Sequence, residues 1–122
     1  MAVTAAQRQH WQQRLQAEAA AVAERTAAAR QLAQVAAERL LERWRDLQGI
    51  WLFGSLRDGR FGLTSDVDLA VAGLPEDALL GSMALLEPLQ DGGIVIDLVR
   101  LEDLAPHWQQ RIRERAAALL TE

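Results

Sequence analysis

The sequence contains no cysteine, lysine, asparagine or tyrosine, and only two histidines. Without cysteine the chain can form no disulfide, no thiolate zinc site and no thiol nucleophile. Two histidines are too few for a histidine-rich metal centre. All 13 positive charges are arginines, and 17 acidic residues outnumber them. The net charge of −4 and the pI near 5.2 argue against a protein whose main task is binding nucleic acid.

Long apolar runs are also missing, and no stretch approaches the roughly 20 residues that a transmembrane helix needs. The N-terminal stretch MAVTAAQRQHWQQRLQ lacks the basic start and leucine-rich core of a signal peptide. We therefore expect a protein of the cytoplasm with no membrane contact. The length of 122 residues predicts one domain with a modest core, which leaves no room for a separate substrate domain.

Helix breakers are absent from the first third of the chain, where the first glycine is Gly49. Residues 4–47 are rich in strong helix formers and predict one long helix, with Thr4 as N-cap and Gly49 as C-terminal glycine. A helix of about 44 residues spans ~66 Å, so it has to overhang a small domain, break, or pack on another chain. We assign residues 1–47 as a helical arm for oligomer or partner contact.

The outer half of this arm carries a narrow stripe of mostly small residues. The stripe consists of Trp11, Leu15, Ala19, Val22, Thr26 and Ala29. Such a stripe suits a second copy of the same helix, a helix of another protein, or a helical hairpin within the chain. A homo-oligomer through the N-terminal helix is thus one expected assembly.

After the arm, short apolar runs alternate with turns and amphipathic segments. Three strands and two helices are predicted, at residues 50–53, 66–72 and 94–99 and at residues 76–89 and 107–120. Pro106 is well placed as a first helical residue of the last helix. This order predicts an α/β (α+β) protein: a small mixed β-sheet with flanking helices over residues 48–122, preceded by the long helical arm.

Three aspartates stand out in the predicted strands. Asp66 and Asp68 are two residues apart, so both side chains leave the same face of a strand. Asp97 interrupts the apolar run 94–99, where an unpaired carboxylate is costly. Carboxylates in this arrangement favour a hard divalent ion, Mg²⁺ or Mn²⁺. The structural alternative is that Asp66 caps a turn, Asp68 is solvated, and Asp97 pairs with an arginine such as Arg100.

A candidate phosphate site precedes the aspartates. Gly54 and Ser55 follow an apolar strand and open a short helical turn, where backbone N–H groups and the hydroxyl can hold phosphate oxygens. Arg57 and Arg60 follow in the same loop, and Asp58 adds a negative charge between them. A glycine-serine pair by itself is a weak signal, since an ordinary strand-to-turn junction has the same pattern.

Gly54-Ser55, then Asp66-Val67-Asp68 after ten intervening residues, and Asp97 on a later strand together resemble the DNA polymerase β-like nucleotidyltransferase superfamily. The stretch WLFGSLRDGRFGLTSDVDLAVAGL, with IVIDLVRLEDL after it, is similar to the minimal nucleotidyltransferase (MNT) domains of prokaryotes. This resemblance covers roughly residues 49–115. Residues 1–30 lie outside it.

The resemblance implies roles for particular residues. The nucleotide-binding set would be Gly54, Ser55, Arg57 and Ser65, with the Ser65 hydroxyl orienting Asp66 or contacting phosphate. The catalytic and metal-binding set would be Asp66, Asp68 and Asp97, holding two Mg²⁺ ions, with Mn²⁺ as a substitute. Asp97 would also help to deprotonate the acceptor hydroxyl. Where family members often carry basic residues, this loop has Leu56 and Asp58, a departure that concerns nucleotide affinity rather than the metal ligands.

The resemblance also implies a function. MNT proteins typically accompany HEPN-domain toxins, and active members transfer AMP from ATP to a tyrosine hydroxyl of the toxin. We therefore expect an Mg²⁺-dependent protein adenylyltransferase that acts as the antitoxin of a HEPN-type toxin. One alternative is a binding module that neutralises a partner by docking alone. Another is a nucleotidyltransferase acting on a small molecule or nucleic acid. Arg111, Arg113 and Arg115 are interpreted as a solvated helix face, and His10 and His107 as surface residues.

Overall fold

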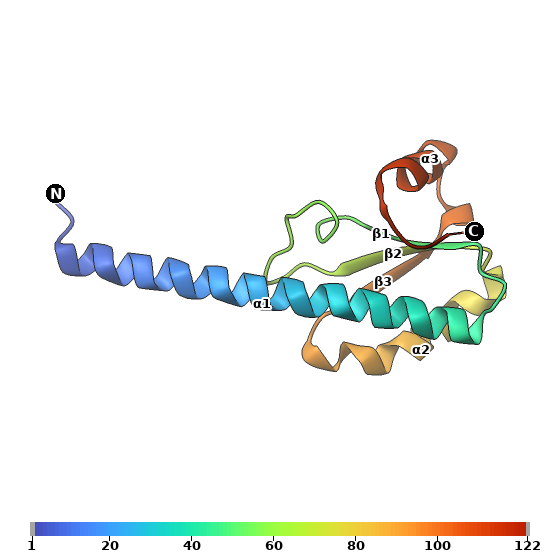
Figure 1. Cartoon of the computed structure of the whole chain (residues 1–122), viewed down its shortest axis with the longest axis horizontal. Helices are drawn as coiled ribbons and strands as arrows, with labels where there is room; N and C mark the ends of the chain where they lie inside the picture. The colour runs from blue at the N-terminus through green and yellow to red at the C-terminus, as the bar shows by residue number, and fades with distance from the viewer. Residues whose placement is uncertain (1, 122) are drawn as a thin grey trace.

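The computed structural model describes residues 2–121 and shows a four-stranded sheet between helices (Figure 1). The helices are α1 (Ala5–Arg43), α2 (Leu79–Leu86) and α3 (Pro106–Arg115). The strands are β1 (Gly49–Phe53), β2 (Val67–Ala72), β3 (Ile96–Arg100) and β4 (Ala117–Thr121), in the sheet order β3-β2-β1-β4. Strands β2 and β3 are parallel, and the other neighbours are antiparallel. The mixed sheet and the long first helix confirm the predicted fold class. No helix in the described part of the chain is long and apolar enough to cross a bilayer.

Helix α1 begins where the sequence predicts. The Thr4 side chain accepts a hydrogen bond from the backbone N–H of Gln7, and the Gln7 side chain accepts one from the N–H of Thr4. This reciprocal capping box fixes the first turn. The predicted end is wrong, because the helix stops at Arg43 and Gly49 lies in β1 without a positive φ. The missing side chain at Gly49 instead makes room for the ring of Trp51.

The second half of α1 packs on one face of the sheet, and α2 covers the same face. The buried cluster there includes Ala29, Ala33, Ala36, Ala37 and Leu40 of α1, with Ile50, Leu52, Val67, Leu69 and Leu98 of the strands. Small alanines let the helix approach the sheet closely, and each fully buried leucine or isoleucine contributes about 1.5–3 kcal/mol. The first part of α1, through Ala21, is exposed and projects beyond the sheet (Figure 1). Of the three arrangements foreseen for a long helix, the structure shows the overhang.

The opposite face of the sheet is covered only in part, by α3. A second buried cluster lies there, formed by Trp51, Ala70, Ala72, Leu101 and Ile112. Because side chains alternate along a strand, Asp68 in β2 and Asp97 in β3 belong to this same face. The partial cover leaves one end of this face open for a site.

The C-terminal segment departs from the prediction of a helix over residues 107–120. Helix α3 ends at Arg115, and residues 117–121 form β4, which pairs with β1. Without β4, strand β1 would be an edge with unpaired backbone groups, so inter-strand hydrogen bonding overrides the helix propensity of Ala and Leu. The predicted helix 76–89 is also divided, into a 3₁₀ turn, α2 and a second 3₁₀ turn.

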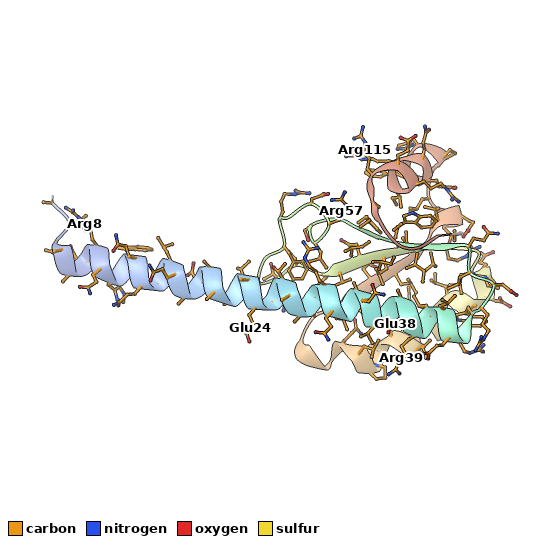
Figure 2. The ribbon with its side chains drawn as sticks, viewed as in Figure 1. Arg8, Glu24, Glu38, Arg39, Arg57 and Arg115 are labelled. Atoms are coloured by element: carbon orange, nitrogen blue, oxygen red, sulfur yellow. The ribbon has the colours of Figure 1, made fainter. Side chains whose placement is uncertain are left out.

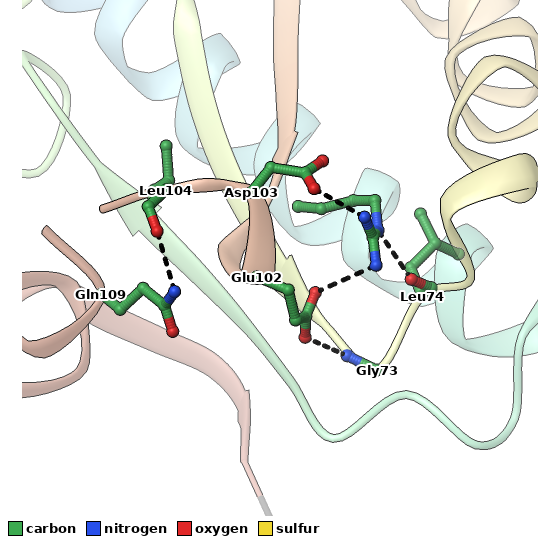
Figure 3. Close-up of polar contacts among 7 residues, drawn as sticks. Gly73, Leu74, Glu102, Asp103, Leu104 and Gln109 are labelled. Atoms are coloured by element: carbon green, nitrogen blue, oxygen red, sulfur yellow. Dashed lines mark hydrogen bonds and ion pairs between the residues drawn. The ribbon is translucent and has the colours of Figure 1, made fainter. Parts of the chain in front are cut away.

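Arg100 lies at the end of β3 away from the aspartates, where Leu74, Glu102 and Asp103 come together (Figure 3). Its Nε donates to the carbonyl oxygen of Leu74 at 2.8 Å, and its Nη1 lies 2.7 Å from Oδ1 of Asp103. Its Nη2 lies 3.8 Å from Glu102. Arg100 therefore pairs with these two acids and not with Asp97, which removes the pair named in the structural alternative.

Candidate active site

The three aspartates lie at one end of the sheet, on the face that α3 covers in part. Asp68 and Asp97 are direct partners in the parallel register of β2 and β3. Neighbouring strands are about 4.8 Å apart, so these two carboxylates are adjacent. Asp66 comes just before β2 and is exposed, as Asp97 is, whereas Asp68 is half-buried. The structure thus brings together the three acids that the sequence singles out, although Asp97 lies on an edge strand rather than in an enclosed one.

The electrostatics at Asp68 show that the three charges oppose one another. Burial raises the pKa of the Asp68 carboxyl above its ordinary value, and the negative charges of Asp97 and Asp66 raise this pKa further. Within the described residues no arginine forms an ion pair with any of the three. A hard divalent cation would relieve this repulsion, and carboxylate oxygens are its preferred ligands.

The three side chains share a face without converging on one point. Among the side chains that the structure describes, no three acidic or histidine residues form a ready metal-binding group. Asp66 and Asp97 are both exposed, so their side chains have room to rotate toward Asp68. The donor set therefore fits Mg²⁺ or Mn²⁺ in chemistry, and the assignment of ligands stays a prediction.

Gly54 places the glycine-serine loop directly against Asp68. The glycine follows β1 with a φ of +76°, and a Cβ in its place would overlap Oδ2 of Asp68. Phe53, the last residue of β1, is the cross-strand partner of Asp68. The backbone N–H of Asp58 donates to the carbonyl of Gly54 at 3.0 Å, which gives the short helical turn expected after Ser55. The candidate phosphate loop and the candidate metal ligand are therefore in contact.

Two arginines of α1 hold the loop that joins β1 to β2. Arg25 donates through Nε to the carbonyl of Gly62 at 3.2 Å and through Nη2 to that of Ser65 at 3.0 Å. Arg30 donates to the carbonyl of Leu56 at 3.3 Å. The sequence gives no signal for these contacts, because they join a side chain to backbone atoms 26 to 40 residues away. The long helix thus positions the segment that leads into Asp66.

Ser65 has a structural role in this loop. Its Oγ accepts a hydrogen bond from the backbone N–H of Gly62 at 3.0 Å and closes the turn. The sequence led us to expect this hydroxyl to orient Asp66 or to contact phosphate. The structure shows the turn contact, and a contact with nucleotide stays a prediction.

Replacing Arg25 by Gln is expected to loosen the segment before Asp66 without unfolding the protein. The variant loses both charged hydrogen bonds to the loop carbonyls, and local opening is governed by just such contacts. Amide hydrogen exchange of residues 62–66 should accelerate at least about fivefold. Arg14→Gln is the matched control, since the contacts of Arg14, with Trp11 and Glu18, both lie within the exposed part of the same helix. Equal exchange in both variants would show that Arg25 does not hold the loop.

A cleft of about 490 Å³ opens beside Gly54, between this loop and α3. Four arginines line it, Arg57 and Arg60 from the loop and Arg111 and Arg115 from α3, together with Trp108. Figure 2 shows Arg57 and Arg115 on the two elements that border the cleft. The loop acid, Asp58, pairs with Arg60 at 3.1 Å, so its negative charge is offset. The cleft therefore presents a positively charged surface next to the three aspartates.

The three arginines of α3 do more than form the solvated helix face that the sequence predicts. All three are exposed, as interpreted from the sequence, but Arg111 and Arg115 also border the cleft. Arg113 differs, since its guanidinium lies over the Trp51 ring, 5.2 Å from its centroid. The sequence spacing could have indicated that Trp108, Arg111 and Arg115 lie on one side of α3, because they follow one another at helical intervals of three and four.

The structure combines a mixed sheet with a glycine turn packed against Asp68, as the resemblance to nucleotidyltransferases predicts. Residues 36–122 match the family model described as polymerase beta, nucleotidyltransferase. The chain belongs to this family. A search of curated proteins found no match.

Solved structures show the same relationship. A chain of a toxin–antitoxin complex crystallised with AMP-PNP is 26% identical, with a TM-score of 0.58 over 73% of this chain and 73% of that one. A protein described as a minimal nucleotidyltransferase is 26% identical, with a TM-score of 0.59 over 75% of this chain and 92% of that one. A complex of a tri-AMPylated Shewanella oneidensis HEPN toxin with its MNT antitoxin matches at 22% identity and a TM-score of 0.55, over 77% of this chain and 73% of that one. At that identity the likeness supports the fold.

Proposed function

We propose that the protein is an Mg²⁺-dependent adenylyltransferase and acts as the antitoxin of a HEPN-type toxin. It would transfer AMP from ATP to a hydroxyl of the toxin, expected to be that of a tyrosine. The observation that carries this proposal is the contact between Gly54 and Asp68 at the border between three carboxylates and an arginine-lined cleft. Carboxylates suit a metal ion, arginines suit phosphates, and the glycine turn joins the two.

The polyphosphate of the nucleotide would lie along the cleft. At Gly54 the backbone is bare of any side chain, so phosphate oxygens can approach the N–H groups of the turn and the Ser55 hydroxyl. Arg57 from the loop and Arg111 and Arg115 from α3 would contact the β- and γ-phosphates. Guanidinium groups bind phosphate oxygens in bidentate fashion, which favours arginine for this purpose.

The chemistry is an in-line displacement at the α-phosphorus. The acceptor oxygen forms a bond to phosphorus, the bond to pyrophosphate breaks, and the hydroxyl proton passes to Asp97 and then to solvent. Two bound Mg²⁺ or Mn²⁺ ions would neutralise charge on the attacking and leaving oxygens. Asp66, Asp68 and Asp97 would hold these ions, and the arginines of the cleft would offset the charge on the departing pyrophosphate.

The amino-acid composition and the structural neighbours support the proposed acceptor, nucleotide and partner. The chain contains no tyrosine, so a tyrosine acceptor has to belong to another molecule. One structural neighbour was crystallised with AMP-PNP, which supports a nucleotide of the ATP type. That neighbour and a second one, at 25% identity, are toxin–antitoxin complexes, the second described as MntA–HepT, which supports a toxin partner of that class.

The test is transfer of label from ATP to a purified HEPN-type toxin in the presence of Mg²⁺. Label at the α-phosphate should appear on the toxin, and label at the γ-phosphate should not. Arg111→Ala combined with Arg115→Ala should raise the KM for ATP at least about tenfold, because charged hydrogen bonds to phosphate are lost. Arg113→Ala is the control for each single substitution, Arg111→Ala or Arg115→Ala, since it removes one positive charge from the same helix outside the cleft.

Two results would overturn the proposal in different ways. A toxin that is silenced without becoming labelled would identify a module that acts by docking alone. Label on RNA ends or on a small molecule, with none on protein, would identify a nucleotidyltransferase with another acceptor.

A further inference from the structure

Residues 5–24 of α1, here named the outer arm, form a helix that touches little else. Figure 1 shows this segment projecting away from the sheet. All side chains through Ala21 are exposed, and the two largest apolar ones, Trp11 and Leu15, are each 56% exposed. The family match begins only at residue 36, so the outer arm lies outside the part shared with the family.

The outer arm continues the helix face that packs against the sheet. Trp11, Leu15 and Val22 follow the same lengthwise row as three residues buried in the core. These are Ala29, Ala33 and Leu40, which are at most 1% exposed. Spacings of four and seven residues keep all six on one side of a helix with 3.6 residues per turn. The helix face that packs on the sheet therefore continues into the outer arm, where it is exposed to solvent for about five turns.

Charge along the outer arm is divided into two halves. Arg8 and Arg14 occupy the first half, and Glu18 and Glu24 the second. Figure 2 shows Arg8 near the free end and Glu24 near the sheet. Arg14 and Glu18 are each two residues from Gln16, and Arg8 and Glu24 are each eight residues from it. The pattern is symmetric about Gln16, with the sign inverted.

Such a pattern is self-complementary in one orientation only. If two arms lie antiparallel and centred on Gln16, Arg14 of each copy lies level with Glu18 of the other, and both flank the apolar row. Glu24 lies on the far side of the helix from that row and takes no part in the contact. If they lie parallel, like charges meet. Arg14 and Glu18 are one helical turn apart and share a side of the helix, so both can reach across to the second copy. Beside the apolar row, the small side chain of Ala19 allows close approach.

We propose that two copies of the chain associate through their outer arms in antiparallel orientation, centred near Gln16. Trp11 of each copy then packs against Ala19 and Val22 of the other arm, and the two copies of Leu15 lie side by side. The two catalytic domains lie at opposite ends of the pair, so each candidate site stays open to its own partner. This association is independent of the transfer reaction. A contact along about 25 Å of helix is small, so it forms at micromolar rather than nanomolar concentrations.

Sedimentation of the full chain over a range of concentrations tests the association. We expect a reversible monomer–dimer equilibrium, weakened at least about tenfold by Arg14→Glu, because each dimer then carries two repulsive contacts with Glu18. The double variant Arg14→Glu/Glu18→Arg restores opposite charges and should return the equilibrium to within threefold of the wild type. A chain that stays monomeric up to about 100 μM, well above the range expected for so small an interface, would overturn the proposal.

Crosslinking tests the orientation, and the cysteine-free chain makes single-cysteine variants easy to interpret. In the antiparallel pair the two copies of residue 15 are offset by about 3 Å along the axis, and those of residue 22 by about 18 Å. A disulfide needs Cα atoms within about 7 Å. Leu15→Cys should therefore form a crosslinked dimer and Val22→Cys should not, although both lie on the same face. Crosslinking of both would show a parallel pair and overturn the proposal, as would binding of the arm to the toxin by a monomeric chain.

Discussion

Replacing Asp68 by Asn is expected to abolish nucleotidyl transfer while stabilising the metal-free protein. Asn keeps the shape of the side chain but removes the charge that would hold a cation. Loss of residues that merely orient metal ligands costs 10- to 100-fold in activity, so loss of a ligand should cost more than about 100-fold. The measurement is the rate of label transfer to the toxin at saturating Mg²⁺.

The gain in stability follows from the raised pKa of the Asp68 carboxyl. Between the ordinary pKa and the raised one, the folded protein keeps a proton that the unfolded chain releases, so stability falls as the pH rises through that window. At neutral pH the wild type therefore holds an unfavourable ionised group, and the Asn variant does not. The difference in the free energy of unfolding should shrink as the pH is lowered toward the ordinary aspartate pKa of about 4, because the raised pKa of the Asp68 carboxyl makes the folded protein take up this proton first.

Urea unfolding in the presence of a chelator measures this difference at both pH values. Asp77→Asn is the control, because Asp77 is an exposed carboxylate in the turn before α2. Addition of Mg²⁺ should stabilise the wild type and leave the Asp68 variant unchanged. Transfer within a few fold of the wild type in the Asp68 variant would show that this carboxylate is not a ligand.

The sequence predicted those parts of the fold that depend on local patterns. The strand near residues 50–53 and the capped start of α1 were found because apolar runs and capping residues are read over a few positions. The strand β4 was missed, since its residues, among them Ala117 and Leu119, form a strand only by pairing with β1, far away in the chain. The end of α1 was misplaced because Gly49 serves the packing of Trp51 and not a helix cap.

The same division applies to the candidate site. Asp66, Asp68 and Gly54 lie on one short stretch, and their spacing carried the prediction of a metal and phosphate site. The contacts of Arg25 with loop carbonyls could not be predicted, because backbone oxygens carry no sequence signature. Arg115 was treated as surface, since only the placement of α3 opposite the loop turns this side of the helix into the wall of a cleft.

Gly54→Ala is expected to impair both stability and nucleotidyl transfer, whereas Gly59→Ala should impair stability alone. Both glycines have a φ of +76°, so alanine at either position incurs about 1–2 kcal/mol of backbone strain. At Gly59 nothing lies within 4 Å of an added Cβ. At Gly54 the Cβ overlaps Oδ2 of Asp68 and lies 3.1 Å from its Cγ, so the carboxylate has to move.

Moving that carboxylate should lower the free energy of unfolding by a further ~1–3 kcal/mol, as overpacking does. Transfer should fall at least about 100-fold, because Asp68 leaves its place beside Asp97. Urea unfolding and label transfer measure the two effects. A double-mutant cycle separates strain from contact: in an Asp68→Ala background, Gly54→Ala should destabilise no more than Gly59→Ala does. Equal effects of the two glycine substitutions in the wild-type background would contradict a functional contact between the turn and the carboxylate. The matched φ values make the comparison direct, since the two positions differ in what stands beside the glycine and not in the backbone conformation that alanine has to adopt.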